Sequence, residues 1–415
     1  MIKYDRFELK NGLKVIVHKD KTTPIVAINI VYNVGARDES EEKTGFAHLF
    51  EHLMFGGSVN IPNYDAPLQI VGGENNAFTN NDITNYYLTL PKENIETGFW
   101  LESDRMLSLA FSEKSLEVQR SVVIEEFKQR YLNQPYGDVY LLLRPLAYKK
   151  HPYKWATIGK EVSHIENATI QDVKDFFYSN YAPNNAVMVV AGDVETEDVK
   201  KLVQKWFGDI ERRDIKPKNL PKEPKQTEAR TLTVKKDVPY HAIYKAYHMC
   251  DRLHPDYHAT DLLSDILSNG DSSRLYRKLV QEQKLFLELN AYIMGSNDDG
   301  LFIISGKINE AVDISKAEQA IQTEIDTLIK NGIETEELQK VKNKVEASLI
   351  YSEVSLLNRA MNLAMRDLID DAKNVNSETK KYTVVKDVDI IRMAKQVLTK
   401  ENCSTLYYLS ESLSK

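Results

Sequence analysis

The apolar residues in the first half of the chain predict strands followed by helices. Residues 14–18 and 24–32 are rich in β-branched apolar residues, which favours strands. Apolar residues then recur with helical spacing over 45–55, and Gly56-Gly57 ends that predicted helix. The later elements expected in this half are a hairpin over 75–90, helices over 92–110 and 113–130, a strand over 185–192 and a helix over 195–207.

A linker divides this pattern from a second copy of it. Residues 215–229 contain three prolines among lysines and glutamates, which indicates a stiff, solvated segment. The order of strands and helices therefore occurs twice, and we predict two similar domains, over 1–214 and 230–415. Two unrelated domains are the alternative. The elements expected after the linker are strands over 240–247, 301–308 and 403–409, and helices over 256–269, 313–331 and 335–365.

Composition excludes several classes of protein. The net charge is −7, from 54 basic and 61 acidic residues, so no nucleic-acid partner is expected. No apolar run reaches the roughly 20 residues that a membrane-spanning helix needs. The start of the chain lacks the apolar stretch of a secretory signal. Cys250 and Cys403 lie far apart in sequence, so neither a disulfide framework nor a thiolate zinc site is expected. A cytoplasmic location is the resulting expectation.

The helix predicted over 45–55 carries a candidate metal site. His48 and His52 are four residues apart, which places both imidazoles on one face of a helix. Glu51 lies beside them, where a carboxylate is able to take a proton from metal-bound water. This H-x-x-E-H pattern is the inverted form of a metallopeptidase motif. The alternative is a helix with surface histidines, but the apolar residues around them indicate a substantially buried helix.

A catalytic zinc site needs a third protein ligand and an open fourth position. The helix predicted over 113–130 supplies Glu117, Glu125 and Glu126 as candidates. We interpret Val118, Val122, Val123 and Phe127 as the apolar stripe that turns this helix inward. Periodicity does not choose between Glu125 and Glu126, because neighbouring residues differ by about 100° around a helix.

These motifs resemble the M16 family of metallopeptidases. The family pattern pairs H-x-x-E-H at 48–52 with a later V-x-E-E, here VIEE at 123–126. Further similar segments are NGLKVIV, VGARDE, NAFTNNDITNYY, HPYKWATIG and YAPNNAVMVVAGDV, which cover most of the first half in family order. The resemblance implies an α+β fold of two similar domains, as in LuxS-like metallohydrolases. Each domain would be a mainly antiparallel sheet with helices packed on one face.

The resemblance also implies roles for individual residues. His48 and His52 become zinc ligands, Glu51 the general base, and Glu126 the third ligand. A strand beside the zinc would bind an extended peptide through its backbone. The implied substrate-binding residues are Asn76, Ala77, Phe78, Thr79 and Tyr86.

The sequence departs from the family at three positions. Gln119 stands where many members have a glutamate seven residues before the third ligand. In the second half, Val280 and Leu287 stand where members have an arginine and a tyrosine that grip the substrate. Arg277 and Tyr292 lie close by but out of register. This half is therefore expected to be structural.

These features lead to an expected function and expected partners. The resemblance implies a zinc-dependent endopeptidase that cleaves unstructured peptides inside a clamshell of two such units. The missing grip predicts a dimer, either a heterodimer with a second M16-like chain that has the Arg/Tyr pair, or a homodimer. A non-catalytic scaffold subunit is the alternative function. A second metal at His254 and His258 is a further, weaker expectation from their spacing.

Overall fold

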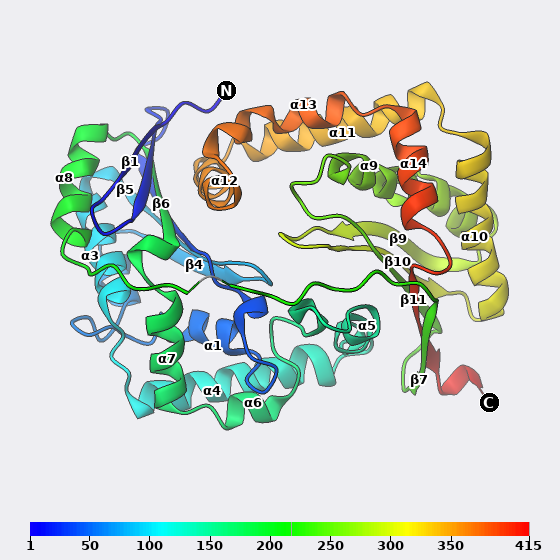
Figure 1. The fold of residues 1–415 in the computed structure, drawn as a ribbon, viewed down its shortest axis with the longest axis horizontal. Helices are drawn as coiled ribbons and strands as arrows, with labels where there is room; N and C mark the ends of the chain where they lie inside the picture. Colours follow the sequence, from blue (N-terminus) through cyan, green and yellow to red (C-terminus); the bar gives the residue numbers. More distant parts are fainter. Residues whose placement is uncertain (217, 415) are drawn as a thin grey trace. The chain divides into compact units, whose positions relative to one another are not determined.

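Two β-sheets organise the chain, and each belongs to its own compact unit (Figure 1). Unit 1 comprises Met1–Gln129, Trp155–Leu220 and Ile350–Ser377, and unit 2 comprises Arg130–Lys154, Pro221–Leu349 and Glu378–Lys415. The computed structural model describes residues 1–216 and 218–414. Pro217 of the predicted linker and Lys415 of the predicted C-terminal domain lie outside the described residues.

The sheet of unit 1 has six strands in the order β1-β2-β6-β3-β5-β4. Strands β2 and β6 pair in parallel, and all other neighbours are antiparallel. Strand β4 lies at one edge of the sheet and pairs only with β5 within the sheet. The strands are β1 (Asp5–Glu8), β2 (Lys14–Lys19), β3 (Ile25–Tyr32), β4 (Glu74–Thr79), β5 (Thr84–Pro91) and β6 (Ala186–Gly192).

The sheet of unit 2 repeats this topology without a counterpart of β1. Its order is β7-β11-β8-β10-β9, and its one parallel pair is β7 with β11. Strand for strand in chain order, this matches β2-β6-β3-β5-β4, so β9 occupies the edge position of β4. The prediction of two similar α+β domains is therefore confirmed. The strands are β7 (Arg230–Lys236), β8 (Ala242–His248), β9 (Phe286–Met294), β10 (Leu301–Ile308) and β11 (Cys403–Ser410).

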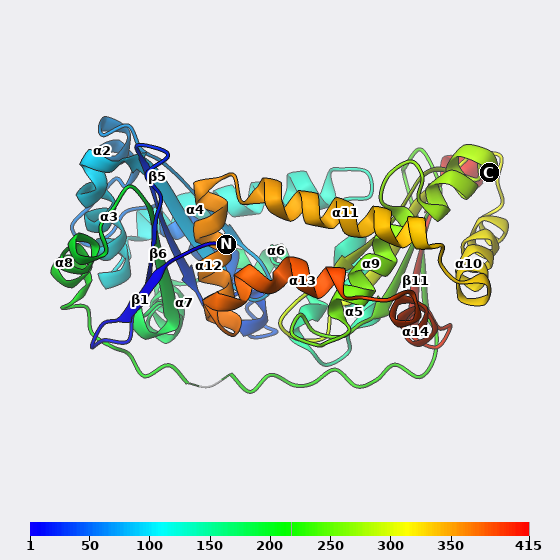
Figure 2. The same cartoon turned by 90° about the horizontal axis from the view of Figure 1, so that it is seen from above.

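Each sheet is covered on both faces, whereas the sequence predicted helices on one face. Helix α12 (Leu356–Ile369) lies across β3 and β6 of unit 1 (Figures 1 and 2). Helix α5 (Val139–Ala147) packs against β8 and β11 of unit 2. Both sheets are apolar on both faces, as in β3, where nearly every side chain is buried, and each second face needs a cover.

These two covering helices change the domain boundaries. Helix α5 comes from the first half of the sequence and belongs to unit 2, while α12 comes from the second half and belongs to unit 1. The units are therefore not the contiguous ranges 1–214 and 230–415. The predicted linker contains no helix or strand among its described residues.

Further α-helices complete the two units. The helix predicted over 335–365 is interrupted, because Ser355 accepts a hydrogen bond from the backbone N–H of Asn358 at 3.2 Å and begins a new helix. Unit 1 also contains α1 (Phe46–Leu53), α2 (Asp65–Ile70), α3 (Ile95–Leu107), α4 (Glu113–Phe127), α6 (Val162–Glu166), α7 (Ile170–Asn180) and α8 (Thr196–Phe207). The remaining helices are α9 (Tyr257–Ser268), α10 (Ile314–Asn331), α11 (Thr335–Ser352), α13 (Glu378–Thr383) and α14 (Asp387–Val397).

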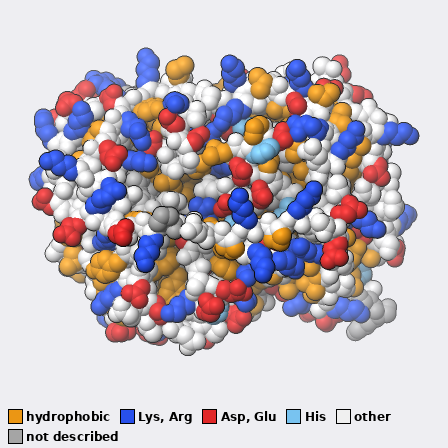
Figure 3. All heavy atoms as spheres, in the orientation of Figure 1, with side chains coloured by type: hydrophobic (Ala, Val, Ile, Leu, Met, Phe, Trp, Pro, Cys, Tyr) orange, Lys and Arg blue, Asp and Glu red, His pale blue; other side chains and the backbone are white. Residues whose placement is uncertain are grey.

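The surface carries charges of both signs. On the face drawn in Figure 3, lysine and arginine side chains are interspersed with aspartate and glutamate. None of the helices in residues 1–216 and 218–414 is both long enough and apolar enough to span a bilayer.

Candidate metal centre and active site

Helix α1 carries the H-x-x-E-H motif and turns its apolar side inward. The exposed fractions of the His48 and His52 side chains are 14% and 24%. The motif spacing therefore places both imidazoles on the accessible side of the helix. The buried side consists of Phe46, Ala47, Leu49, Phe50 and Leu53.

The first turn of α1 is held by a carboxylate from the preceding loop. Gly45 precedes the helix with φ of 85°, and a Cβ there would lie 2.6 Å from the carbonyl oxygen of Ile158, so glycine is required. Gly45 has no side chain to cap the helix. Glu39 takes this role and accepts hydrogen bonds from the N–H groups of Gly45 at 2.9 Å and Ala47 at 2.8 Å. Burial raises the pKa of Glu39 well above its usual value.

Helix α4 brings Glu126 to the site from a different side. Ser112 caps this helix by accepting a hydrogen bond from the N–H of Ser115 at 3.1 Å. The predicted apolar stripe was partly wrong, because Val118 and Val122 are 50% and 45% exposed. At about 100° per residue, Glu126 lies between the buried side of α4 and these two valines. The residues that α4 buries are Leu116, Val123 and Phe127.

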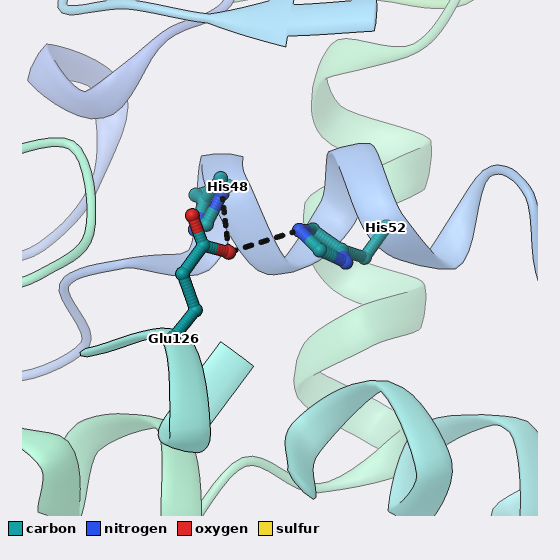
Figure 4. A group of neighbouring side chains, drawn as sticks. All are labelled: His48, His52 and Glu126. Atoms are coloured by element: carbon teal, nitrogen blue, oxygen red, sulfur yellow. Dashed lines mark ion pairs between the residues drawn. The ribbon is translucent and has the colours of Figure 1, made fainter. Parts of the chain in front are cut away.

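His48, His52 and Glu126 meet in a geometry that fits a metal ion (Figure 4). Glu126 Oε2 lies 3.6 Å from His48 Nε2 and 3.5 Å from His52 Nε2. Donors about 2.1 Å from a tetrahedral zinc ion lie roughly 3.4 Å apart, so these separations match. Within residues 1–216 and 218–414, this is the only trio of such side chains, with ligand atoms within 4.8 Å of one another. Two nitrogens and one carboxylate oxygen leave a fourth position open.

The other candidate glutamates point elsewhere. Glu125 accepts a hydrogen bond from Lys128 Nζ at 2.8 Å, and 61% of its side chain is exposed. Glu117 is paired with Arg120 on the outer side of α4. Of the three glutamates that the sequence left open, the structure brings only Glu126 to the histidines.

Glu51 lies beside the trio without belonging to it. Its pKa is raised, first by burial and also by the nearby charge of Glu126. Hydrogen bonding to Thr79 and the charge of His52 act in the opposite direction. A carboxyl group with a raised pKa is a better proton acceptor than an ordinary surface glutamate.

Strand β4 lies at the edge of the sheet of unit 1 and turns part of its backbone away from the sheet. Asn80 N–H donates to the carbonyl oxygen of Ile83 at 3.0 Å, and the alternation of an antiparallel pair then turns the backbone groups of Ala77 and Thr79 away from β5. The N–H of Ala77 donates instead to Oδ1 of Asn76 at 2.8 Å, and the backbone of Thr79 is hydrogen-bonded to Glu51. The edge therefore becomes open to pairing with another strand once Asn76 and Glu51 release these backbone groups.

Two of the predicted substrate-binding side chains are packed against other parts of unit 1. Tyr86 is fully buried, and its hydroxyl lies 3.2 Å from that of Tyr181. The guanidinium of Arg105 lies over its ring, 4.4 Å from the centroid. Direct contact between Tyr86 and a substrate is thus a wrong prediction, because β5 is an inner strand and its side chains fill the core. Phe78 is partly buried against the cluster that includes Ala360 of α12.

The departures from the family have clear structural settings in unit 2. Val280 packs against the hydrophobic core, while Leu287 lies on edge strand β9 and is 44% exposed. The side chain of Arg277 is 55% exposed. The hydroxyl of Tyr292 is hydrogen-bonded to the hydroxyl of Tyr140 of α5. Neither Val280 nor Leu287 offers a hydrogen bond from its side chain.

The histidines proposed for a second metal have other partners. His258 Nε2 lies 3.0 Å from Glu378 Oε1, and His254 Nδ1 accepts a hydrogen bond from the N–H of Asp256 at 3.1 Å. No third ligand joins these two histidines in the described part of the chain.

Sequence reasoning missed Glu39 as a residue that supports the site. Glu39 precedes the motif helix by several residues, so helix periodicity does not include it. The available signal was the missing N-cap side chain, since Gly45 leaves the first N–H groups of α1 to be satisfied from elsewhere.

Two families of known domains match successive parts of the chain. The insulinase domain of peptidase family M16 matches residues 14–159. The M16 inactive domain matches residues 167–345. The metal trio lies within the first match, and the second match contains Val280 and Leu287.

Individual relatives match nearly the whole chain. The zinc protease PqqE of Helicobacter pylori is 31% identical over 411 residues, covering 98% of this chain and 92% of that protein. The crystal structure of a protease from Helicobacter pylori superposes with a TM-score of 0.93 and 31% identity, covering 98% and 100% of the two chains. Pitrilysin is similar in fold, with a TM-score of 0.79 and 18% identity, and the match covers 98% of this chain but 45% of pitrilysin.

Proposed function

Since the chain belongs to peptidase family M16, we propose that it is a zinc-dependent endopeptidase acting on unstructured peptides. The observation that carries this proposal is the meeting of His48, His52 and Glu126, with Glu51 beside them. The relatives named zinc proteases support the metal and the reaction class.

The chain's own residues account for the main steps of peptide hydrolysis. His48, His52 and Glu126 would hold the zinc ion, which when bound supplies Lewis-acid activation of water and of the peptide carbonyl. Glu51 takes the proton from the attacking water and delivers it to the leaving amine. Burial raises the pKa of Glu51, which favours its acting as a base.

The edge position of β4 supports the proposal of an extended substrate. A peptide that adds to this edge exchanges backbone hydrogen bonds with the outward groups of Ala77, and its affinity then depends little on sequence. Asn76 and Thr79 flank that position. A segment already folded into another protein has its backbone groups occupied, so it does not pair with β4 in this way.

We therefore expect unfolded substrates to be cleaved and folded ones spared. The measurement compares one sequence in two forms, as a free unstructured peptide and as part of a tightly folded protein. Efficient cleavage of the folded form without prior unfolding would contradict a mechanism based on strand addition and a closed chamber.

We also infer that a second M16-like chain completes the enzyme. The chain corresponds to less than half of pitrilysin, so the longer protein has room for two such units. Val280 and Leu287 leave this chain without the Arg/Tyr grip that the family resemblance implies. Losing a hydrogen bond to a charged group costs about 1.5–3 kcal/mol, or roughly 10- to 150-fold in binding. A partner of similar length that carries the pair would restore it.

The partner is tested by measuring peptide cleavage with and without that second chain. We expect the rate to rise when the partner is added. The alternative is a homodimer in which Arg277 or Tyr292 grips the substrate. Full activity of the chain alone, slowed by both Arg277→Ala and Tyr292→Phe, would establish the homodimer instead.

A scaffold subunit is the second candidate function, because residues 167–345 match the M16 inactive domain. The two proposals predict different results when metal-dependent peptide cleavage is measured. A scaffold would show no metal-dependent cleavage either alone or with any partner, although it would keep its fold.

A further inference from the structure

A lysine of the linker is anchored next to the metal-binding helix. Lys218 follows the last helix of the first half and reaches the loop that precedes α1, within unit 1. Its Nζ lies 2.7 Å from Asp38 Oδ2 and also donates to the carbonyl oxygen of Asn33. The exposed fractions of the Lys218 and Asp38 side chains are 20% and 3%, so solvent screens this ion pair poorly.

The Asp38 carboxylate depends on Lys218 for its charge compensation. Oδ2 accepts a hydrogen bond from the N–H of Gly35 at 2.8 Å. Oδ1 is buried and has no hydrogen-bond partner among the described residues. Arg37 is a weaker influence on this carboxylate, and its guanidinium pairs with Asp82 at 3.1 Å. Removing the Lys218 ammonium would leave a buried carboxylate with little compensation, which is strongly unfavourable.

Asp38 is adjacent to the residue that caps the metal helix. Glu39 holds the N–H groups of Gly45 and Ala47, and Ala47 immediately precedes His48. An uncompensated charge on Asp38 would repel the buried Glu39 carboxylate beside it. A movement of the loop to relieve this repulsion would pull the cap away from α1.

The same loop is fastened to the β4–β5 hairpin. The N–H of Ala36 donates to the carbonyl oxygen of Asn80 at 3.0 Å, and the N–H of Arg37 donates to that of Asn81 at 2.9 Å. The loop thus joins the metal-binding helix to the strand edge on which a substrate would lie. The position of this loop therefore affects both the metal-binding helix and the edge of β4.

We propose that Lys218 is a positioning residue for the metal centre. Through its ion pair with Asp38 it fixes loop 35–39, so that Glu39 caps α1 and the two histidines face Glu126. This role links the linker between the two halves of the sequence to the metal site. The proposal rests on the proposed function only in its assignment of the zinc ligands. It does not depend on peptidase activity, because metal binding is measured without any substrate.

The test measures zinc affinity in Lys218→Met, which keeps a long side chain without its charge. We expect zinc to bind about 10- to 100-fold more weakly, the range found for groups that orient metal ligands. Lys218→Arg keeps the charge and is expected to bind zinc nearly as wild type does. Lys216→Met is the matched control, because Lys216 is an exposed lysine of the same linker. Its zinc affinity is expected to be unchanged.

A double variant shows whether the effect passes through Asp38. Adding Asp38→Asn to Lys218→Met removes the uncompensated charge, and zinc affinity should return to within about 3-fold of wild type. If Lys218→Met alone fails to fold, the zinc affinity of this double variant still tests the proposal.

Wild-type zinc affinity in folded Lys218→Met, or a double variant no tighter than the single one, would overturn the proposal. These outcomes are distinct from failure of the proposed function. A wild-type chain that binds zinc without cleaving peptides would contradict the enzyme while leaving the role of Lys218 intact.

Discussion

Glu51→Gln is expected to keep one zinc ion per chain and to lose at least about 10²-fold in the rate of peptide cleavage. The amide of glutamine has nearly the same shape as the carboxylate but does not accept a proton at neutral pH. Glu51 lies outside the ligand trio, so the metal should remain. The measurement is the turnover of an unstructured peptide at saturating zinc.

The comparison for this variant is Glu125→Gln, which makes the same chemical change on the outer side of α4. Its rate should stay near that of wild type. A rate for Glu51→Gln equal to that of Glu125→Gln would rule out Glu51 as the general base.

Glu126→Gln is expected to lose the metal, because a neutral amide replaces the charged oxygen ligand. Glu126 is the only carboxylate among the described residues whose oxygen lies near both histidine nitrogens, at 3.5 and 3.6 Å. The two histidines alone would leave an incomplete site. Metal content after dialysis against zinc-free buffer measures the loss directly.

Glu125→Gln again provides the matched control, since Glu125 is adjacent in sequence but is paired with Lys128. It should retain its zinc. If Glu126→Gln retained zinc and Glu125→Gln lost it, the assignment of the third ligand would be reversed.

The features of the fold and site that the sequence predicted depend on local spacing. His48 and His52 share a face of α1 because residues four apart on a helix always do. The repeated order of strands predicted the two similar sheets, because each strand is recognisable from the apolar residues within it. The repeat extends to β9, which occupies the edge position of β4, and to α9, which follows β8 as α1 follows β3 but lacks the motif.

The parts that the sequence did not predict depend on contacts between distant segments. No periodicity indicates that α5 and α12 each cover the sheet of the other half, because an amphipathic helix does not specify its partner. Tyr86 matches the family strand beside the zinc, yet its side chain fills the core. The choice of Glu126 over Glu125 also needed the packing of α4, which fixes the rotation of that helix.

The most direct test of the account measures zinc content and peptide cleavage on the same samples of three proteins. Each is assayed with the partner chain if the partner proves necessary. Wild type should contain one zinc ion and cleave, Glu51→Gln should contain one zinc ion and not cleave, and Glu126→Gln should contain no zinc and not cleave. A wild-type protein that cleaves equally well after complete removal of its metal would contradict the central claim.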